Sequence, residues 1–437
     1  MTNISNLPRD LTEEVLSKLP LTSLKRVRST CKNWNNVSKD RSFAMKHLGD
    51  QAKLAARERE FKVVMIMDFK VYLMSVNLDN NGDVESCIKP QAKLISLDDE
   101  VDDVYQVFHC NGLLLCITKD NTRLTVWNPY WGHVRLIEPT HNFHRLDWYY
   151  HALGYNKSSK SYKILRFTDY DDDDDDTDYF VDFRIYDFNS NSWRVLDITH
   201  QDWVIFLSNH GVSLKGNTYW LAKDKYSEIR ITAEESVLVC FDFTSETFGQ
   251  PLSLPFKFYN SILDTMSLSI VREEQLVLLR NPWNTLSMEI WVTTKIEPNT
   301  VSWNSKVFLE TNIIKLIPSP SHFPFPFTNP SFFIDEEKKV AVVFDKATLS
   351  IYGNSTCNNK AYIFGVDGSL EKVDLRGVCA KSFCYTHVCS YVPSLMQLND
   401  RRPPIKYTYF RKRKRGSPTD NTRERSKQIK TIVSPKN

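Results

Sequence analysis

The chain has 437 residues, of which 41% are hydrophobic, 12% aromatic and 25% charged, and its formal net charge is +3. This balance suits a folded protein with a large core and argues against a chain that is disordered throughout. No apolar run approaches the ~18 residues of a membrane-spanning helix, so we expect no membrane association.

The first residues and the cysteines indicate the compartment. Residues 1–5 carry neither the basic region nor the apolar segment of a secretory signal. The nine cysteines have no regular spacing, so we expect reduced thiols rather than disulfides. Both observations favour the nucleus and/or the cytoplasm.

Residues 1–47 show the periodicity of a small three-helix unit. One face of the first predicted helix carries Leu11, Val15, Leu16 and Leu19, and Pro20 ends that helix. Helical spacing continues through Leu24, Val27, Cys31 and Trp34. So small a unit has little core of its own, and we expect part of its apolar surface to bind a partner.

The stretch from Leu7 to His47 resembles an F-box. It reads Leu-Pro-x-Asp-Leu, Val-Leu-x-x-Leu-Pro, Ser-Leu-x-x-Val-Arg-x-x-Cys-Lys-x-Trp and Phe-x-x-x-His. Thr12 and Thr30 depart from the pattern, since family members often carry aliphatic residues there. The resemblance implies docking to the Skp-type adaptor of a cullin-RING ubiquitin ligase. The adaptor-binding residues that it implies are Leu7, Pro8, Leu11, Val15, Leu16, Leu19, Pro20, Leu24, Val27, Cys31 and Trp34.

A helical linker is expected over residues 48–60, which are rich in helix formers. Beyond residue 61 the pattern changes to short β-branched and aromatic runs. A strand with a large apolar residue before a polar turn recurs at Val76, Trp127, Tyr186, Phe241, Trp291 and Phe364. The spacings of 51, 59, 55, 50 and 73 residues suggest propeller blades.

Each repeat also contains an earlier strand, over residues 111–116, 161–165, 216–221, 274–278 and 339–344. Two hairpins per repeat would form one four-stranded blade. We therefore predict a mainly β protein with a small all-α N-terminal domain, in which residues 61–398 form a degenerate, roughly six-bladed β-propeller-like domain. The strand-like residues 382–392 are expected to close the ring. The alternative is a sandwich of unrelated hairpins.

Motifs within the β region resemble the plant F-box-associated domain of type 1. They are Cys110-Asn111-Gly112-Leu113-Leu114, Val126-Trp127-Asn128-Pro129, Leu153-Gly154-Tyr155, Tyr186-Asp187 with Trp193, and Cys240-Phe241-Asp242. With the F-box, this resemblance implies a non-catalytic substrate-recognition subunit of a Skp-cullin-F-box E3 ubiquitin ligase. The β domain would recruit a protein substrate, whose identity the family does not indicate.

Two segments do not suit a packed core. Residues 169–178 are an acidic run that repels itself, which predicts a solvated loop. Residues 317–330 contain five prolines, which predict an extended connector and explain the long last repeat spacing.

Catalytic and metal-binding patterns are weak in this sequence. There is no Gly-rich phosphate loop, no His-Glu-x-x-His and no Gly-x-Ser-x-Gly. Cys379, Cys384, His387 and Cys389 lie close together, but they lack the separated ligand pairs of a structural zinc site. We therefore expect no enzyme activity, no metal and no cofactor.

The tail from residue 399 to 437 is strongly basic. Residues 401–437 contain thirteen Lys and Arg against two acidic residues, a local charge of +11, which leaves −8 for residues 1–400. We expect a disordered tail in which Arg411, Lys412, Arg413, Lys414 and Arg415 act as a nuclear localisation signal. The alternative is a nuclear nucleic-acid-associated protein that binds through this tail, with Tyr407, Tyr409 and Phe410 as stacking groups.

Overall fold

The computed structural model describes residues 7–58, 60–67, 70–78, 88–93, 104–118, 124–137, 149–170, 180–198, 201–205, 210–224, 236–256, 265–282, 285, 287–313, 330–344, 360–374 and 387–398. The predicted basic tail, with Arg411–Arg415, lies outside these residues. So do the acidic residues 171–178 and all of the proline-rich stretch except Pro330. The hypotheses on these segments therefore stay predictions, except that Asp169 and Tyr170, which were expected in the acidic loop, lie in a strand that runs to Tyr170, because they pair with Val181 and Phe180.

Four helices begin the described chain: α1 (Arg9–Ser17), α2 (Leu21–Arg28), α3 (Lys32–Lys39) and α4 (Arg41–Glu58). The first three form the predicted helical unit. Asp40 begins α4, because its carboxylate accepts hydrogen bonds from the N–H groups of Ser42 (2.8 Å) and Phe43 (3.4 Å). Since α4 is continuous, the expected boundary between residues 47 and 48 falls inside one helix. None of the described helices is long and apolar enough to cross a membrane.

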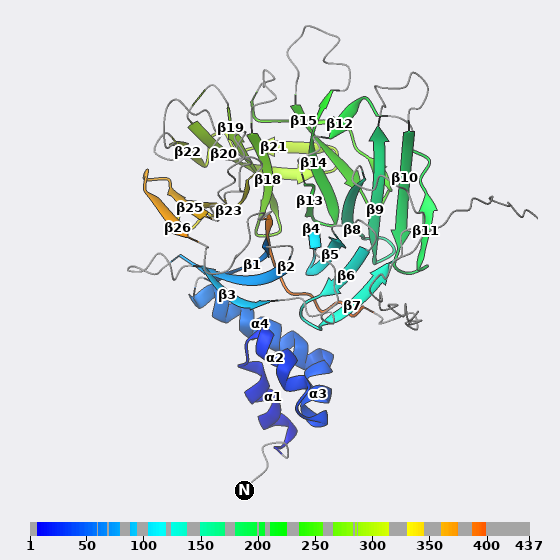
Figure 1. Cartoon of the computed structure of the whole chain (residues 1–437), viewed down its shortest axis with the longest axis vertical. Helices are drawn as coiled ribbons and strands as arrows, with labels where there is room; N and C mark the ends of the chain where they lie inside the picture. Colours follow the sequence, from blue (N-terminus) through cyan, green and yellow to red (C-terminus); the bar gives the residue numbers. More distant parts are fainter. Residues whose placement is uncertain are drawn as a thin grey trace, which may run out of the picture. The chain divides into compact units, whose positions relative to one another are not determined.

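Six antiparallel sheets follow, and each is one blade of a propeller (Figure 1). Blade 1 consists of β27 (His387–Ser390), β1 (Glu60–Met67), β2 (Lys70–Asn77) and β3 (Ile88–Lys93). Blade 2 consists of β4 (Val104–Cys110), β5 (Leu113–Thr118), β6 (Leu124–Asn128) and β7 (His133–Ile137). Blade 3 consists of β8 (Tyr150–Asn156), β9 (Ser161–Tyr170), β10 (Phe180–Asp187) and β11 (Ser192–Val195).

The other three blades follow the same antiparallel plan. Blade 4 consists of β12 (Trp203–Ile205), β13 (Val212–Leu214), β14 (Asn217–Asp224), β15 (Ser236–Asp242), β16 (Thr247–Phe248) and β17 (Leu252–Ser253). Blade 5 consists of β18 (Thr265–Val271), β19 (Gln275–Asn281), β20 (Ser287–Glu297), β21 (Thr300–Trp303) and β22 (Leu309–Asn312). Blade 6 consists of β23 (Ser331–Asp335), β24 (Val340–Phe344), β25 (Lys360–Gly365) and β26 (Leu370–Asp374).

The repeat read from the sequence coincides with the blades. All six anchors lie on the third strand of a blade, counted from the inside: β2, β6, β10, β15, β20 and β25. The earlier strands of the repeats are the second strands β5, β9, β14, β19 and β24. The prediction of a six-bladed propeller is confirmed, and the sandwich alternative is wrong.

The C-terminal strand closes the ring. β27 pairs antiparallel with β1, from Val63 opposite Ser390 to Ile66 opposite His387, and becomes the inner strand of blade 1. Each neighbouring pair of blades shares one apolar cluster, and one of these clusters joins blade 6 to blade 1. In that cluster Met65 and Val76 pack with Phe344. The ring is therefore continuous in hydrogen bonds and in packing.

The strand order gives the propeller two distinct faces. Turns from the first to the second strand and from the third to the fourth strand lie on one face, here named the turn face. Contacts between neighbouring blades confirm this, since Tyr155 N–H donates to Gly216 O (2.9 Å) and Arg272 pairs with Glu336 (3.4 Å). The connections between blades start and end at the opposite face, here named the loop face.

Candidate protein-interaction site

Helix α1 carries an exposed apolar pair. Leu11 and Val15, one helical turn apart, keep 49% and 47% of their surface exposed. Pro8, just before the helix, is exposed, and Leu7 is half-buried. Exposing large aliphatic side chains to water is unfavourable, and burying them against a partner is favourable. This surface is therefore suited to bind an apolar partner.

The residues implied by the F-box resemblance divide into surface and core. Leu16 and Leu24 are fully buried among Val37, Phe43 and Ala44. Of the remaining residues, Pro20 is exposed, and the half-buried ones are Leu19, Val27, Cys31 and Trp34. Leu16 and Leu24 therefore hold the helices together in the free chain, and their part in adaptor binding stays a prediction.

The two departures from the motif have local hydrogen bonds. Thr12 is buried, and its hydroxyl donates to Leu7 O (3.3 Å), which secures the start of α1. Thr30 is exposed, and its hydroxyl donates to Val27 O (2.7 Å) at the end of α2. Neither threonine leaves its hydroxyl unpaired.

Arg28 joins the helices to the propeller. Its Nη1 donates to Tyr130 O (3.0 Å) and Trp131 O (3.3 Å), in the turn between β6 and β7. The guanidinium lies 5.6 and 5.2 Å from the centres of the two aromatic rings. Its Nε and Nη2 donate to Ser38 on α3. Burial lowers the pKa of Arg28, and the carbonyl and ring contacts compensate for the water that it loses.

The other side of this turn packs against α4. Tyr130 is buried with its hydroxyl 3.3 Å from Nδ1 of His47, whose Nε2 lies 2.8 Å from Leu19 O. Tyr130 and Trp131 belong to the same apolar cluster as Leu16 and Leu24. The helical unit and blades 1 and 2 therefore share one core, and the joint lies on the turn face.

Asn128 holds the turn and the C-terminal segment together. It is fully buried at the end of β6. Its Nδ2 donates to Ser394 O (3.1 Å) and Met396 O (2.6 Å), while its Oδ1 accepts from the N–H groups of Tyr130 (2.9 Å) and Trp131 (3.4 Å). This single amide links the turn that accepts the hydrogen bonds of Arg28 to the segment that follows β27.

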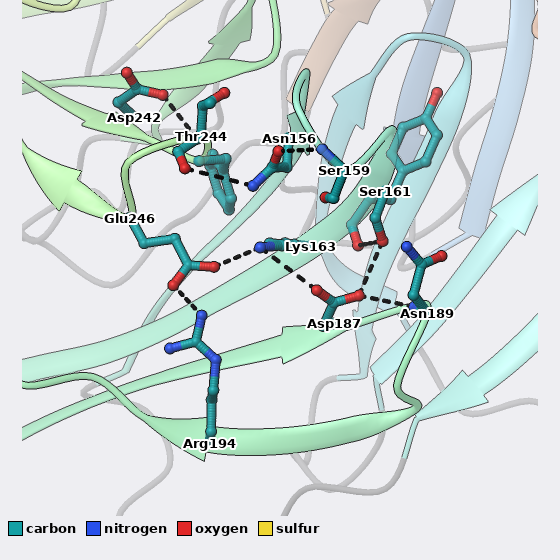
Figure 2. A network of polar contacts seen from close by, with 12 residues as sticks. Asn156, Ser159, Ser161, Lys163, Asp187, Asn189, Arg194, Asp242, Thr244 and Glu246 are labelled. Carbon is teal, nitrogen blue, oxygen red and sulfur yellow. Dashed lines mark hydrogen bonds and ion pairs between the residues drawn. The ribbon is translucent and has the colours of Figure 1, made fainter.

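A polar network joins blades 3 and 4 on the turn face (Figure 2). Lys163 lies between Asp187 (3.4 Å) and Glu246, and Arg194 contacts the other oxygen of Glu246. Burial acts to raise the pKa of Glu246, but the hydrogen bonds from Arg194 and Lys163 outweigh it and lower the pKa. Two cations balance two carboxylates, so the network stabilises the joint between blades.

The inner strands surround a narrow cavity of about 60 Å³, enough for a few water molecules. Its polar lining comprises His109, His210, Ser213, Ser267, Ser269, Ser331 and Ser390. His109 Nδ1 lies 3.9 Å from a carboxylate oxygen of Glu273, which belongs to the opposite blade 5. Burial lowers the pKa of His109 to about 4 and raises that of Glu273 to about 7.

Glu273 predicts a pH-dependent stability. Its pKa is about 7 in the folded chain against 4.5 for a free side chain. The protonated carboxyl therefore contributes fully to the free energy of unfolding below pH 4.5, and this contribution is lost as the pH rises through 7. A glutamine at this position cannot ionise. The free energy of unfolding of the Glu273→Gln variant is therefore expected to rise relative to that of wild type, by on the order of 2 kcal/mol from pH 4.5 to pH 8. Urea unfolding of both proteins across this range measures the difference, and parallel stability curves would contradict it.

Metal-binding residues do not gather in the described part of the chain, where no three His, Cys, Asp or Glu side chains are placed to hold an ion. Of the predicted cluster, Cys379 and Cys384 lie outside the described residues. Burial raises the pKa of the Cys389 thiol to about 12, so the thiol stays protonated at neutral pH in the metal-free chain.

Comparisons with known proteins identify both parts of the chain. Residues 4–46 match the F-box domain, and residues 62–398 match the F-box associated beta propeller domain. An F-box protein of Arabidopsis thaliana is 58% identical over 405 residues, covering 90% of this chain and 100% of that protein. An F-box/kelch-repeat protein of the same plant is 49% identical over 412 residues, covering 91% of this chain and 100% of that protein.

The chain is a plant F-box protein with an F-box-associated β-propeller. The family resemblance seen in its motifs is thus confirmed, and neither matching family is a family of enzymes.

In this F-box protein, sequence reasoning missed the joint. In the sequence, Arg28 lies within the F-box motif but resembles any solvated helical arginine, and His47 marks only the end of the motif. Tyr130 and Trp131 carried one usable signal, since two large aromatic residues in a turn require a covering partner. Nothing in the sequence indicates that the partner is the F-box itself.

Proposed function

We propose that this F-box protein is the substrate-recognition subunit of a Skp-cullin-F-box E3 ubiquitin ligase and performs no chemistry itself. The F-box binds a Skp-type adaptor, and the propeller recruits a protein substrate for ubiquitination. The observation that carries the proposal is the exposed apolar pair Leu11 and Val15 on α1, within a complete F-box motif.

The contact between the F-box and the propeller suggests that adaptor and substrate bind different surfaces. Because Arg28 and His47 bind the turn at Tyr130 and Trp131, the F-box occupies part of the turn face. The loop face carries the connections between blades, and binding residues concentrate in such connections. We therefore assign substrate recruitment to the loop face and adaptor binding to α1.

Replacing Leu11 and Val15 together by Ala is expected to weaken adaptor binding about tenfold to a hundredfold. Fully burying each side chain is worth roughly 1.5–3 kcal/mol, and about half of each remains to be buried on binding, so the pair contributes roughly 1.5–3 kcal/mol. Because both side chains are exposed in the free protein, the variant should melt like wild type. Calorimetric titration of the Skp-type adaptor measures the affinity, and thermal unfolding checks the fold.

Two controls define what this experiment can show. Leu54→Ala removes an aliphatic side chain that is 41% exposed on α4, outside the implied set, and should leave the affinity unchanged. Leu16→Ala removes a fully buried side chain and should lower the melting temperature as well. If wild type does not bind the adaptor, or the Leu11→Ala, Val15→Ala variant binds equally well, the proposed function is wrong.

A further inference from the structure

A second charged cluster lies on blade 3, on the side that packs against blade 2. The apolar core between these blades includes Leu153, Ile164 and Tyr186. Since strand side chains alternate, His151, Arg166 and Arg184 lie on the same side, two residues closer to the loop face. Arg166 is paired with His151 on one neighbouring strand and with Arg184 on the other.

Arg166 is buried, and one edge of its guanidinium makes no hydrogen bond to any residue that the structure describes. The residue is 2% exposed, and its guanidinium lies 3.8 Å from the centre of the Tyr149 ring. Its Nε and Nη2 have no hydrogen-bond partner in the described part of the chain. These two N–H groups point in parallel from one edge of the guanidinium, and that edge matches two oxygens of a carboxylate or phosphate.

The charges around Arg166 do not balance. Arg184 Nε donates to both carboxylate oxygens of Asp182 (2.7 and 3.0 Å), so this carboxylate is already engaged. Burial, together with the charge of Arg166, lowers the pKa of His151 to about 3, which leaves it neutral. Among the residues that the structure describes, the guanidinium groups of Arg166 and Arg184 lie near one carboxylate, that of Asp182, whereas the network around Lys163 has two cations and two carboxylates. A buried charge without a partner is costly, so such a group calls for a specific explanation.

We propose that this cluster is a binding site for an anionic group with at least two oxygens, a phosphate or a carboxylate. The Nε–Nη2 edge of Arg166 holds the two oxygens while Tyr149 covers one face of the guanidinium, and Arg184 adds a second positive charge. The Arg184 side chain is 19% exposed and so reaches solvent, while Nε and Nη2 of Arg166 are buried. The site is independent of adaptor binding.

Inorganic phosphate tests the proposal on the full-length chain. Phosphate should raise the melting temperature of wild type in a saturable manner, relative to potassium chloride at equal ionic strength. Arg166→Met should abolish this shift. In phosphate-free buffer the same variant should melt at or above the wild-type temperature, because an apolar side chain of similar length replaces an unpaired charge.

A matched variant separates this site from general loss of charge. Arg280 also lies over an aromatic ring, 4.2 Å from the centre of Phe256, but Glu289 is 3.6 Å from its Nη1. Arg280→Met should keep the phosphate shift. A positive phosphate shift of the same size in wild type and Arg166→Met would overturn the proposal.

The second arm identifies the source of the anion. The acidic run 171–176 of this chain supplies the same carboxylate chemistry, so a variant with these six aspartates replaced by asparagine is measured in parallel. If the chain's own carboxylates fill the site, phosphate shifts only the asparagine variant, and Arg166→Met removes that shift too. If phosphate shifts neither protein, the site does not exist.

Discussion

A chain that ends at Lys381 is expected to lose the cooperative unfolding transition of the whole propeller. The truncation removes β27, the inner strand of blade 1, and leaves β1 with an unpaired edge. It also removes Val388, Tyr391 and Leu398, which are buried in three different apolar clusters. At roughly 1.5–3 kcal/mol per side chain, the loss approaches the 5–15 kcal/mol that stabilises a typical domain.

Circular dichroism and calorimetry of the truncated chain measure this effect. The control is a chain that ends at Arg401, which retains β27 and the segment after it and removes only the basic tail. This control should melt like the full-length protein. A chain ending at Lys381 that kept the wild-type transition would show that the ring is stable without its closing strand.

Asn128→Ala is expected to destabilise the protein by on the order of 3–5 kcal/mol. The substitution leaves two buried N–H groups and two half-buried carbonyl groups without their partner, and each unsatisfied group costs about 1 kcal/mol. The turn at Tyr130 and Trp131 then loses its connection to the C-terminal segment. Denaturant unfolding monitored by tryptophan fluorescence measures the loss.

Two related variants test the hydrogen-bond interpretation. Asn128→Asp keeps the acceptor oxygen but sets a carboxylate against Ser394 O and Met396 O. It should be strongly destabilised at pH 7 and partly recover at low pH, where a protonated carboxyl can donate again. Asn299→Ala removes an exposed amide that accepts one hydrogen bond, from Gln250 N–H (3.2 Å), and should cost less than about 1 kcal/mol. Equal effects of Asn128→Ala and Asn299→Ala would refute the special role of Asn128.

The repeat was readable because its signals are local. Alternation within strands and polar turns at Asn128, Asp187 and Asp242 depend only on a few neighbouring residues. They can therefore be recognised in the sequence before the fold is known. The third strands identified by Trp127, Tyr186 and Phe241 were therefore predicted correctly. The closing strand could be expected for a related reason, since a ring with an open edge leaves backbone groups unpaired.

The contacts between distant segments could not be read in the same way. Periodicity placed Leu11, Val15 and Leu16 on one helical face, yet Leu16 is buried while the other two are exposed. An apolar stripe has the same pattern whether it meets a core or a partner, because both environments exclude water. The unpaired edge of Arg166 was equally hidden, since its partners on β8 and β10 meet only in the folded sheet.

By itself, the sequence determined the family, the order of helices and strands and the location of the apolar motif, because each of these depends on residues close together in the chain. Only the tertiary structure decided which motif residues are exposed, that Arg28 fastens the F-box to blade 2, and that Asn128 ties the same turn to the C-terminal segment. These properties depend on contacts across about a hundred residues or more, such as Arg28 with Tyr130 and Asn128 with Ser394. Such contacts form only when the closed ring brings those segments together.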